Sequence, residues 1–218
     1  MVRRQVLLSV LGFVLTPTAL ANSGAPAKAQ RPIVMVYGDS LSAAYGLPTS
    51  QGWAALLQKR LEEEKFPHQV INRSLSGETS FGGLQRLPAA LKRQRPAVTL
   101  LALGANDGLR GLSMVETERN LDQMIKALQN AGSKVVLMGI RLPPNYGPES
   151  AKDFERLYRS LARKHNTALV PLLLAGFETD ETLFQADRIH PNANAQPRIL
   201  ENLWPTLRPL LRSSQASR

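Results

Sequence analysis

A serine, a histidine and an aspartate in this sequence are the residue types of a nucleophile, its general base and the group that orients the base. Ser40 follows directly on the apolar run Ile33–Tyr37, in the segment Gly-Asp-Ser-Leu-Ser. His190 comes three residues after Asp187, and Pro191 favours an extended backbone at His190. Acyl transfer by serine requires this set of groups within hydrogen-bond reach. We therefore predict a catalytic triad, although Gly-Asp-Ser and Asp-x-x-His are each also common in ordinary turns.

The choice of base is restricted because the chain has only three histidines. His165 lies near the end of a predicted helix, where the helix dipole favours a basic residue. His68 follows a proline in a predicted loop. Both are interpreted as structural or solvated side chains, which leaves His190 as the candidate base.

Two further polar segments contain groups that can donate hydrogen bonds to a developing oxyanion. Gly77, in Ser-Gly-Glu-Thr, has no side chain, so its backbone N–H can approach a bound molecule closely. Asn106, in Ala-Asn-Asp-Gly, carries a side-chain amide, although Asn-Asp-Gly is also strong turn chemistry. Together with the N–H of Ser40, these groups are predicted to form an oxyanion hole.

The elements that must position these residues are short apolar strands alternating with helical patterns, which predicts an α/β fold with a parallel sheet. The four segments that contain Ser40, Gly77, Asn106 and the Asp187–His190 pair each follow one of the five predicted strands. Because the carboxyl ends of parallel strands share one edge of the sheet, the motifs are expected to converge there. The strands are predicted at residues 33–37, 69–72, 98–103, 134–140 and 168–173.

Helix boundaries are predicted from caps and prolines. Ser50 is expected to cap the helix that follows the first strand, and Ser113 with Glu116 is expected to form a capping box. Residues 79–92 contain two glycines and a proline, which predicts a loop and then a short helix. The last helix is expected to be capped by Asn194, with a kink or an early end at Pro205.

The N-terminus has the pattern of a secretory signal peptide over residues 1–21. Arg3 and Arg4 precede the apolar stretch 6–15, and small residues end at Ala21. The apolar stretch is too short to span a bilayer, which takes about 20 residues. We predict cleavage near Ala21 and a periplasmic or secreted protein without a transmembrane segment.

The remainder is predicted to form one domain, residues 32–211, between disordered segments at 22–31 and 212–218. The chain has no cysteine, which excludes disulfides, a thiol nucleophile and a cysteine metal site.

The formal net charge of +10 suggests attraction to anionic surfaces. Many basic residues, however, lie on predicted solvated helix faces, and no basic run is interleaved with aromatics, so no nucleic-acid partner is expected. Three scattered histidines do not suggest zinc, and phosphate-loop and dinucleotide motifs are absent. No metal or cofactor is predicted. Asp39 and Asp107 are expected to hold loops by hydrogen bonds or to bind a cation.

These residues resemble the four motif blocks of the GDSL, or SGNH, hydrolases, which carry serine, glycine, asparagine and an Asp–His pair. The likeness covers residues 32–211, including 141–147 and 195–197, and is greatest to the bacterial periplasmic enzymes that act as acyl-CoA thioesterase, arylesterase and lysophospholipase. It implies a three-layer α/β/α, flavodoxin-like fold with a five-stranded parallel sheet, a metal-independent acyl-enzyme mechanism and a shallow apolar acyl groove. Members of that subgroup usually have glycine where Ala105 and Arg188 stand here. Arg188 adds bulk and charge between Asp187 and His190, so the substrate preference of the subgroup is less certain here than its catalytic chemistry.

The predicted function is hydrolysis of acyl esters and thioesters through an acyl-enzyme on Ser40. The predicted substrate is a small-molecule ester or thioester, with lysophospholipids among the candidates, and a monomer is expected. Tyr146 and the loop 176–186 are predicted to line the acyl site. Two alternatives are a carbohydrate O-deacetylase with the same triad and a non-catalytic lipid- or glycan-binding module.

Overall fold

The computed structural model describes residues 31–142, 146 and 148–213, and one five-stranded parallel sheet organises them, in the order β2-β1-β3-β4-β5. The central strands β1 and β3 pair over five residues, so that Gly38 lies beside Ala102 where both strands end. This confirms the predicted parallel α/β fold. The strands are β1 Ile33–Gly38, β2 Gln69–Asn72, β3 Val98–Ala102, β4 Lys134–Met138 and β5 Ala168–Val170.

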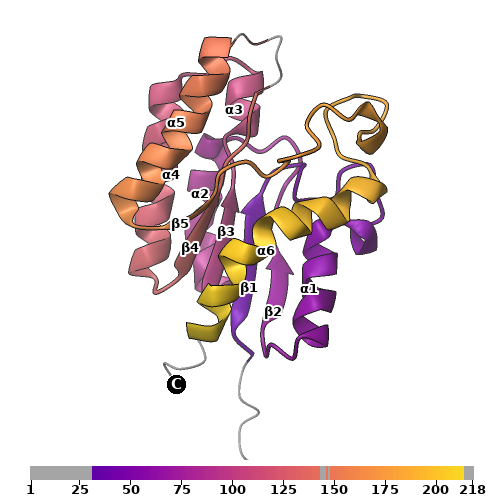
Figure 1. Ribbon diagram of the computed structural model, residues 1–218. Coiled ribbons are helices and arrows are strands. Elements are labelled where there is room, and N and C mark those ends of the chain that lie inside the picture. The colour runs from indigo at the N-terminus through magenta and orange to yellow at the C-terminus, as the bar shows by residue number, and fades with distance from the viewer. Residues whose placement is uncertain (1–30, 143–145, 147, 214–218) are drawn as a thin grey trace, which may run out of the picture. The chain divides into compact units, whose positions relative to one another are not determined.

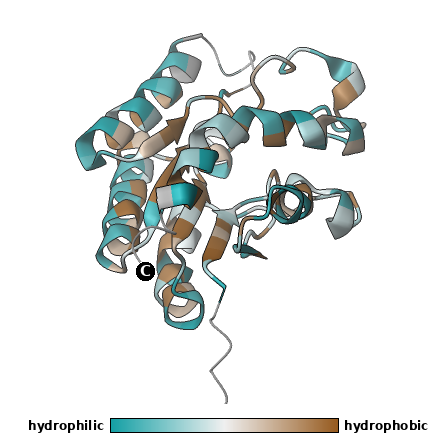
Figure 2. Cartoon of the chain, turned by 60° about the horizontal axis from the view of Figure 1, so that its bottom comes forward, coloured by the Kyte–Doolittle hydropathy of each residue, from teal (hydrophilic) through white to brown (hydrophobic). Residues whose placement is uncertain are grey.

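Helices cover both faces of the sheet, which gives the expected three layers (Figure 1). Alternate residues of β1 point to opposite faces: Val34 and Val36 pack in the core beneath α1 and α6, and Met35 and Tyr37 pack beneath α2, α4 and α5. All four are fully buried, as expected for a strand covered on both sides. Figure 2 shows hydrophobic residues concentrated on the strands and on the inner sides of the helices. The helices are α1 Trp53–Glu63, α2 Ser80–Gln94, α3 Ala105–Leu109, α4 Met114–Asn130, α5 Pro148–His165 and α6 Gln196–Ser213.

The predicted start of α4 is confirmed, whereas the predicted start of α1 is wrong. The Ser113 hydroxyl accepts a hydrogen bond from the N–H of Glu116, as a cap does. Ser50 instead lies in a short 3-10 turn, Thr49–Gln51, and Gly52 is the residue that precedes α1.

The prediction of a loop and a short helix over 79–92 is also wrong, because α2 is a continuous helix of 15 residues. Thr79 caps it by accepting from the N–H of Gly82. Gly83 allows the close approach of α2 to the sheet, since a Cβ there would lie 2.4 Å from a methyl of Leu103. Pro88 lies inside the helix, where packing against α4 and β1 outweighs the lost hydrogen bond.

The last helix differs from expectation at its start. Asn192, not Asn194, accepts the capping hydrogen bond of a 3-10 turn, Ala193–Ala195, which leads into α6. Pro205 does not end α6, which bends in its second half (Figure 1) and continues to Ser213, beyond the predicted domain end at 211. Its continuation follows from a buried apolar stripe that includes Leu203, Leu207 and Leu211.

The predicted signal peptide, and all of the predicted disordered ends except Arg31, Arg212 and Ser213, lie outside the described residues. Within residues 31–142, 146 and 148–213, no helix is long and apolar enough to cross a membrane.

Candidate active site

Ser40 lies in the tight turn that follows β1, at the carboxyl edge of the sheet. The turn closes on Asp39, whose carbonyl accepts from the N–H groups of Ser42 and Ala43 at 3.1 and 2.9 Å. Gly38 is required before it, because a Cβ there would lie 2.9 Å from the carbonyl oxygen of Ala102 on β3. The close contact of two strand ends therefore fixes where the serine projects.

The structure brings Ser40, His190 and Asp187 into a hydrogen-bonded chain, as the sequence predicts. His190 Nε2 lies 2.9 Å from Ser40 Oγ, and His190 Nδ1 lies 2.6 Å from Asp187 Oδ2. A carboxylate can only accept, so Nδ1 carries a proton and Nε2 is the nitrogen that accepts from the serine hydroxyl. This is the arrangement of a nucleophile, a base and an orienting group.

Asp187 is held by the same short turn that presents His190. Its Oδ1 accepts from the N–H groups of Ile189 and His190 at 2.9 and 3.0 Å. Partial burial opposes ionisation of Asp187, but the hydrogen bonds from the His190 N–H, the imidazole and the Ile189 N–H outweigh it and lower its pKa to about 2. The carboxylate is therefore charged at any pH at which the protein would work.

The other two histidines lie near the amino ends of the strands, on the side of the sheet away from Ser40. Neither can therefore act as the base for Ser40. His68 is fully buried and directly precedes β2. His165 ends α5, and its Nε2 lies 2.6 Å from Asp122 Oδ1.

Two residues that the sequence did not single out also hold His190 in place. The Tyr45 ring packs on the imidazole, with ring centroids 4.4 Å apart. Gln185 donates from Nε2 to the carbonyl of Tyr45 at 2.8 Å, and its backbone N–H donates to the carbonyl of His190 at 2.8 Å. Tyr45 is 145 positions away from its partner in the chain, so no local pattern could have revealed the contact.

Asn106 is the second residue of α3, the short helix that follows β3, and it lines the same cavity as Ser40. Its Nδ2 donates to the carbonyl of Glu78 at 3.0 Å and lies 3.5 Å from Asp39 Oδ2. The second distance is at the limit of a hydrogen bond, so one amide proton is only weakly held. That proton is available to an oxyanion beside Ser40.

Gly77 lies in the loop between β2 and α2, with a φ of 77° that favours glycine. No described residue accepts a hydrogen bond from the backbone N–H of Gly77 or of Ser40. Both donors are therefore free, as an oxyanion hole requires.

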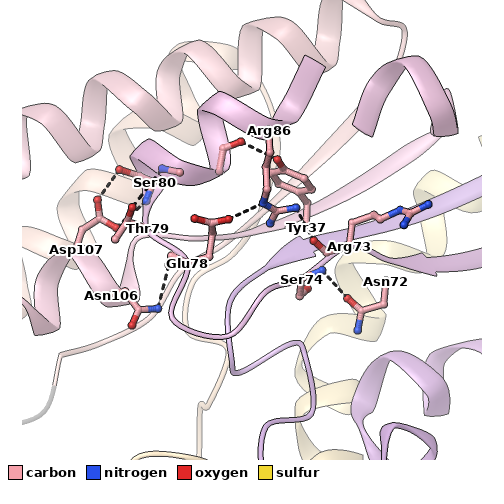
Figure 3. Close-up of polar contacts among 12 residues, drawn as sticks. Tyr37, Asn72, Arg73, Ser74, Glu78, Thr79, Ser80, Arg86, Asn106 and Asp107 are labelled. Atoms are coloured by element: carbon pink, nitrogen blue, oxygen red, sulfur yellow. Dashed lines mark hydrogen bonds and ion pairs between the residues drawn. The ribbon is translucent and has the colours of Figure 1, made fainter. Parts of the chain in front are cut away.

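A polar network, buried at Asp107 and partly exposed at Arg86, holds this loop against α2 and α3 (Figure 3). Arg86 donates to Glu78 Oε2 at 2.6 Å and to the carbonyl of Arg73 at 2.6 Å, while its guanidinium lies 4.0 Å from the centroid of the Tyr37 ring. Asp107 accepts from the N–H of Ser80 at 2.8 Å. The loop that carries Gly77 is thus fixed on both sides.

The two aspartates near the site accept hydrogen bonds from neighbouring segments. Asp107 accepts from Ser80 and Thr117. Asp39 accepts from the N–H of Leu41 at 3.1 Å. Its almost complete burial raises its pKa to about 7, and the nearby carboxylates of Asp107 and Glu78 add to the shift. The described residues contain no cluster of three metal-ligating side chains.

A cavity of about 460 Å³ opens beside Ser40 and His190, and most of its wall is apolar. The loop 176–186, which is predicted to line the acyl site, contributes Glu178, Thr179 and Phe184 to its wall. Tyr146 does not line it; its hydroxyl instead donates to the carbonyl of Leu109, a lining residue, at 2.8 Å. The apolar lining consists of Leu41, Ala105, Leu109, Ile140, Leu142, Leu172, Leu174, Phe184 and Ile189, and the polar lining of Ser40, Asn106, Arg141, Glu178, Thr179, Arg188 and His190.

Comparison with known proteins gives one consistent result. Residues 36–196 match the GDSL-like Lipase/Acylhydrolase family. The chain is 53% identical to the Esterase TesA of Pseudomonas aeruginosa over 178 residues, which cover 82% of this chain and 89% of that protein. It is 39% identical to the Thioesterase 1/protease 1/lysophospholipase L1 of Escherichia coli K12, over 82% of this chain and 84% of that protein. The crystal structure of the psychrotrophic esterase EstA from Pseudoalteromonas, inhibited by monoethylphosphonate, superposes with a TM-score of 0.78 at 38% identity, over 83% of this chain and 98% of that chain.

Proposed function

The chain belongs to the GDSL-like lipase/acylhydrolase family and is an ester and thioester hydrolase, and from this premise we propose that it works through a covalent acyl-enzyme on Ser40. The observation that carries the proposal is the hydrogen-bonded chain from Ser40 Oγ through the imidazole of His190 to Asp187. A non-catalytic binding module has no need for that chain.

In the acylation step, Ser40 Oγ attacks the acyl carbonyl carbon while its proton passes to His190 Nε2. Asp187 stabilises the imidazolium that forms and keeps the ring in the required orientation. The tetrahedral intermediate then collapses: the bond to the leaving oxygen or sulfur breaks, and Nε2 gives its proton to that atom. Water repeats the sequence on the acyl-enzyme, which releases the carboxylic acid and restores the serine.

The charge that develops on the carbonyl oxygen needs donors that are in place beforehand. The free N–H groups of Ser40 and Gly77 and the weakly held amide proton of Asn106 are proposed as these donors. A well-placed donor of this kind typically accounts for about 10²- to 10³-fold in rate.

The apolar wall of the cavity supports an acyl chain longer than acetyl. A carbohydrate O-deacetylase would use the same triad but would need little apolar surface beside the serine. Rates on 4-nitrophenyl esters of increasing chain length separate the two: we expect kcat/KM to rise from acetate to medium-chain esters, whereas a maximum at acetate would favour the deacetylase.

The test of the acyl-enzyme is labelling with an organophosphonate ester, read by mass spectrometry. The protein should gain one adduct on Ser40, and Ser40→Ala should gain none and lose esterase activity. His190→Ala should be inactive, while His165→Ala, which changes a histidine at the opposite edge of the sheet, should stay active. An unlabelled but folded protein, or an active His190→Ala variant, would reject the mechanism.

We also propose that residues 1–21 are a signal peptide and that the enzyme, as a monomer, acts in the periplasm or outside the cell. The support is the charge and apolar pattern of the leader. N-terminal sequencing of the exported protein should begin near Asn22, and a protein that retains its leader in the cytoplasm would contradict the proposal.

A further inference from the structure

Arg188 adopts a backbone conformation that its residue type does not favour. Its φ is 57°, in the left-handed region, within the turn in which its N–H donates to the carbonyl of Gln185 at 2.9 Å. This left-handed conformation is unfavourable for any residue with a Cβ, whereas glycine adopts it readily. The turn itself therefore gives no reason for an arginine, and strained residues of this kind gather at functional sites.

Arg188 is one of the residues that line the cavity beside the proposed base. Its side chain is 75% exposed, and it stands two residues before His190 in the chain. Of the described carboxylates, only Glu181 forms an ion pair with it, at 3.8 Å and with a side chain that is itself 71% exposed. Such an exposed pair is weak and readily exchanged for another anion.

The other charges of the cavity wall are already compensated. Arg141 donates from Nε to Glu155 at 2.6 Å, and its Nη1 lies 3.6 Å from Glu178. Glu178 also accepts from the N–H of Gly176 at 2.8 Å. Among the described lining residues, Arg188 is thus the cation whose charge is least satisfied.

The chemistry fixes which part of a substrate comes near this cation. His190 Nε2 must give its proton to the leaving oxygen or sulfur, so the leaving group lies on the His190 side of Ser40. In the proposed mechanism the acyl chain occupies the apolar part of the cavity. Arg188 belongs to the turn that carries His190, and it therefore stands beside the path of the leaving group.

We propose that Arg188 is a specificity-determining residue that selects substrates carrying an anionic group, such as a phosphate, on the leaving-group side of the ester or thioester. The inference rests on the proposed acyl-enzyme mechanism and adds the charge of the leaving group to it. A guanidinium can bind phosphate through two parallel hydrogen bonds, which suits such a group.

The expected size of the effect is modest because the site is exposed. An exposed ion pair typically changes an equilibrium by about 1.4- to 5-fold. Screening should increase the effect at low ionic strength, since the Debye length grows from about 8 Å at 0.15 M salt to about 30 Å at 0.01 M.

The experiment compares two substrates that differ only in the phosphate group: a 1-acylglycerol 3-phosphate and the 1-monoacylglycerol with the same acyl chain, both below their aggregation concentrations. The quantity measured is the ratio of their kcat/KM values. Arg188→Gln and Arg188→Gly should each lower the ratio by about two- to fivefold at low salt. Glu181→Gln should raise it, because the competing carboxylate is removed, and Arg159→Gln, on the exposed face of α5, should leave it unchanged.

Arg188→Gly serves as the folding control, since glycine relieves the strained backbone. A ratio that is unchanged in both Arg188 variants, or that changes equally in Arg159→Gln, would overturn the role of Arg188. Failure of the underlying mechanism has a different signature: Ser40→Ala would then still hydrolyse both substrates.

Discussion

Asp39 is a fully buried carboxyl group next to the proposed nucleophile, and its ionisation should make the stability of the protein depend on pH. Only 1% of its surface is exposed. Burial raises its pKa from an ordinary 3.8 to about 7. Between these two values the folded protein binds more protons than the unfolded chain, so the free energy of unfolding falls as pH rises through this window.

The magnitude follows from the size of the shift. One pKa unit corresponds to about 1.4 kcal/mol, so the displacement from 3.8 to about 7 amounts to about 4 kcal/mol over the whole window. Roughly 2 to 3 kcal/mol of this should be lost between pH 5 and pH 8. Above pH 8 little further loss from this group is expected.

Asp39→Asn isolates the contribution of this group. The amide keeps an oxygen that can accept from the N–H of Leu41 and removes the ionisation. Urea unfolding of both proteins at a series of pH values from 5 to 8 gives the difference in unfolding free energy. We expect this difference to move in favour of the variant by roughly 2 to 3 kcal/mol across the series.

The control is Asp153→Asn, because the side chain of Asp153 is 46% exposed on α5. Its unfolding free energy should differ from that of the parent by the same small amount at every pH, because only an exposed ion pair with Arg156 is lost. If Asp39→Asn also follows the parent with a constant offset, Asp39 is not protonated in the folded protein near neutral pH, and the reasoning from burial fails.

Two further predictions concern the groups around the nucleophile. Asn106→Ala should lower kcat on a 4-nitrophenyl ester by about 10²- to 10³-fold while the protein stays folded by circular dichroism; a kcat within a few fold of the parent would remove Asn106 from the oxyanion hole. Tyr45→Ala should lower kcat by about two- to tenfold, since an aromatic contact contributes about 0.5–1.5 kcal/mol to holding the His190 ring. Tyr45→Phe keeps the ring and should behave as the parent, so equal losses in the two Tyr45 variants would show that ring packing is not the cause.

The sequence located all five strands, because a strand covered on both faces is a short apolar run that is visible locally. It placed the ends of three strands too late. Ile140 and Leu172, for example, continue the apolar runs but line the cavity beyond the last paired residues. An apolar run indicates only that its residues are shielded from water. A residue that lines a cavity therefore cannot be distinguished by sequence from one that lies in a buried strand.

Helix limits were less predictable where packing opposes local preference. Pro88 and Pro205 each disfavour a helix, yet both lie inside one. The free energy of burying the apolar stripes of α2 and α6 outweighs the local cost of the prolines. The free energy of this burial depends on packing partners that are distant in the chain, so a local sequence pattern does not reveal it.

The features of the candidate active site also fall into two groups: those that the sequence predicts and those that depend on the folded structure. The sequence by itself determined which residue types were available: a serine in the Gly-Asp-Ser segment after the first strand, one histidine outside the predicted structural positions, and an aspartate three residues before it. Only the tertiary structure decided that Ser40 and His190, 150 positions apart, lie 2.9 Å from each other, that Tyr45 packs on the base, and that Asp39 is buried. It also placed Arg188 among the residues that line the cavity, with a backbone in the left-handed region. Residue type follows from the chain alone, whereas distance, burial and charge compensation arise only when the strand ends meet at one edge of the sheet.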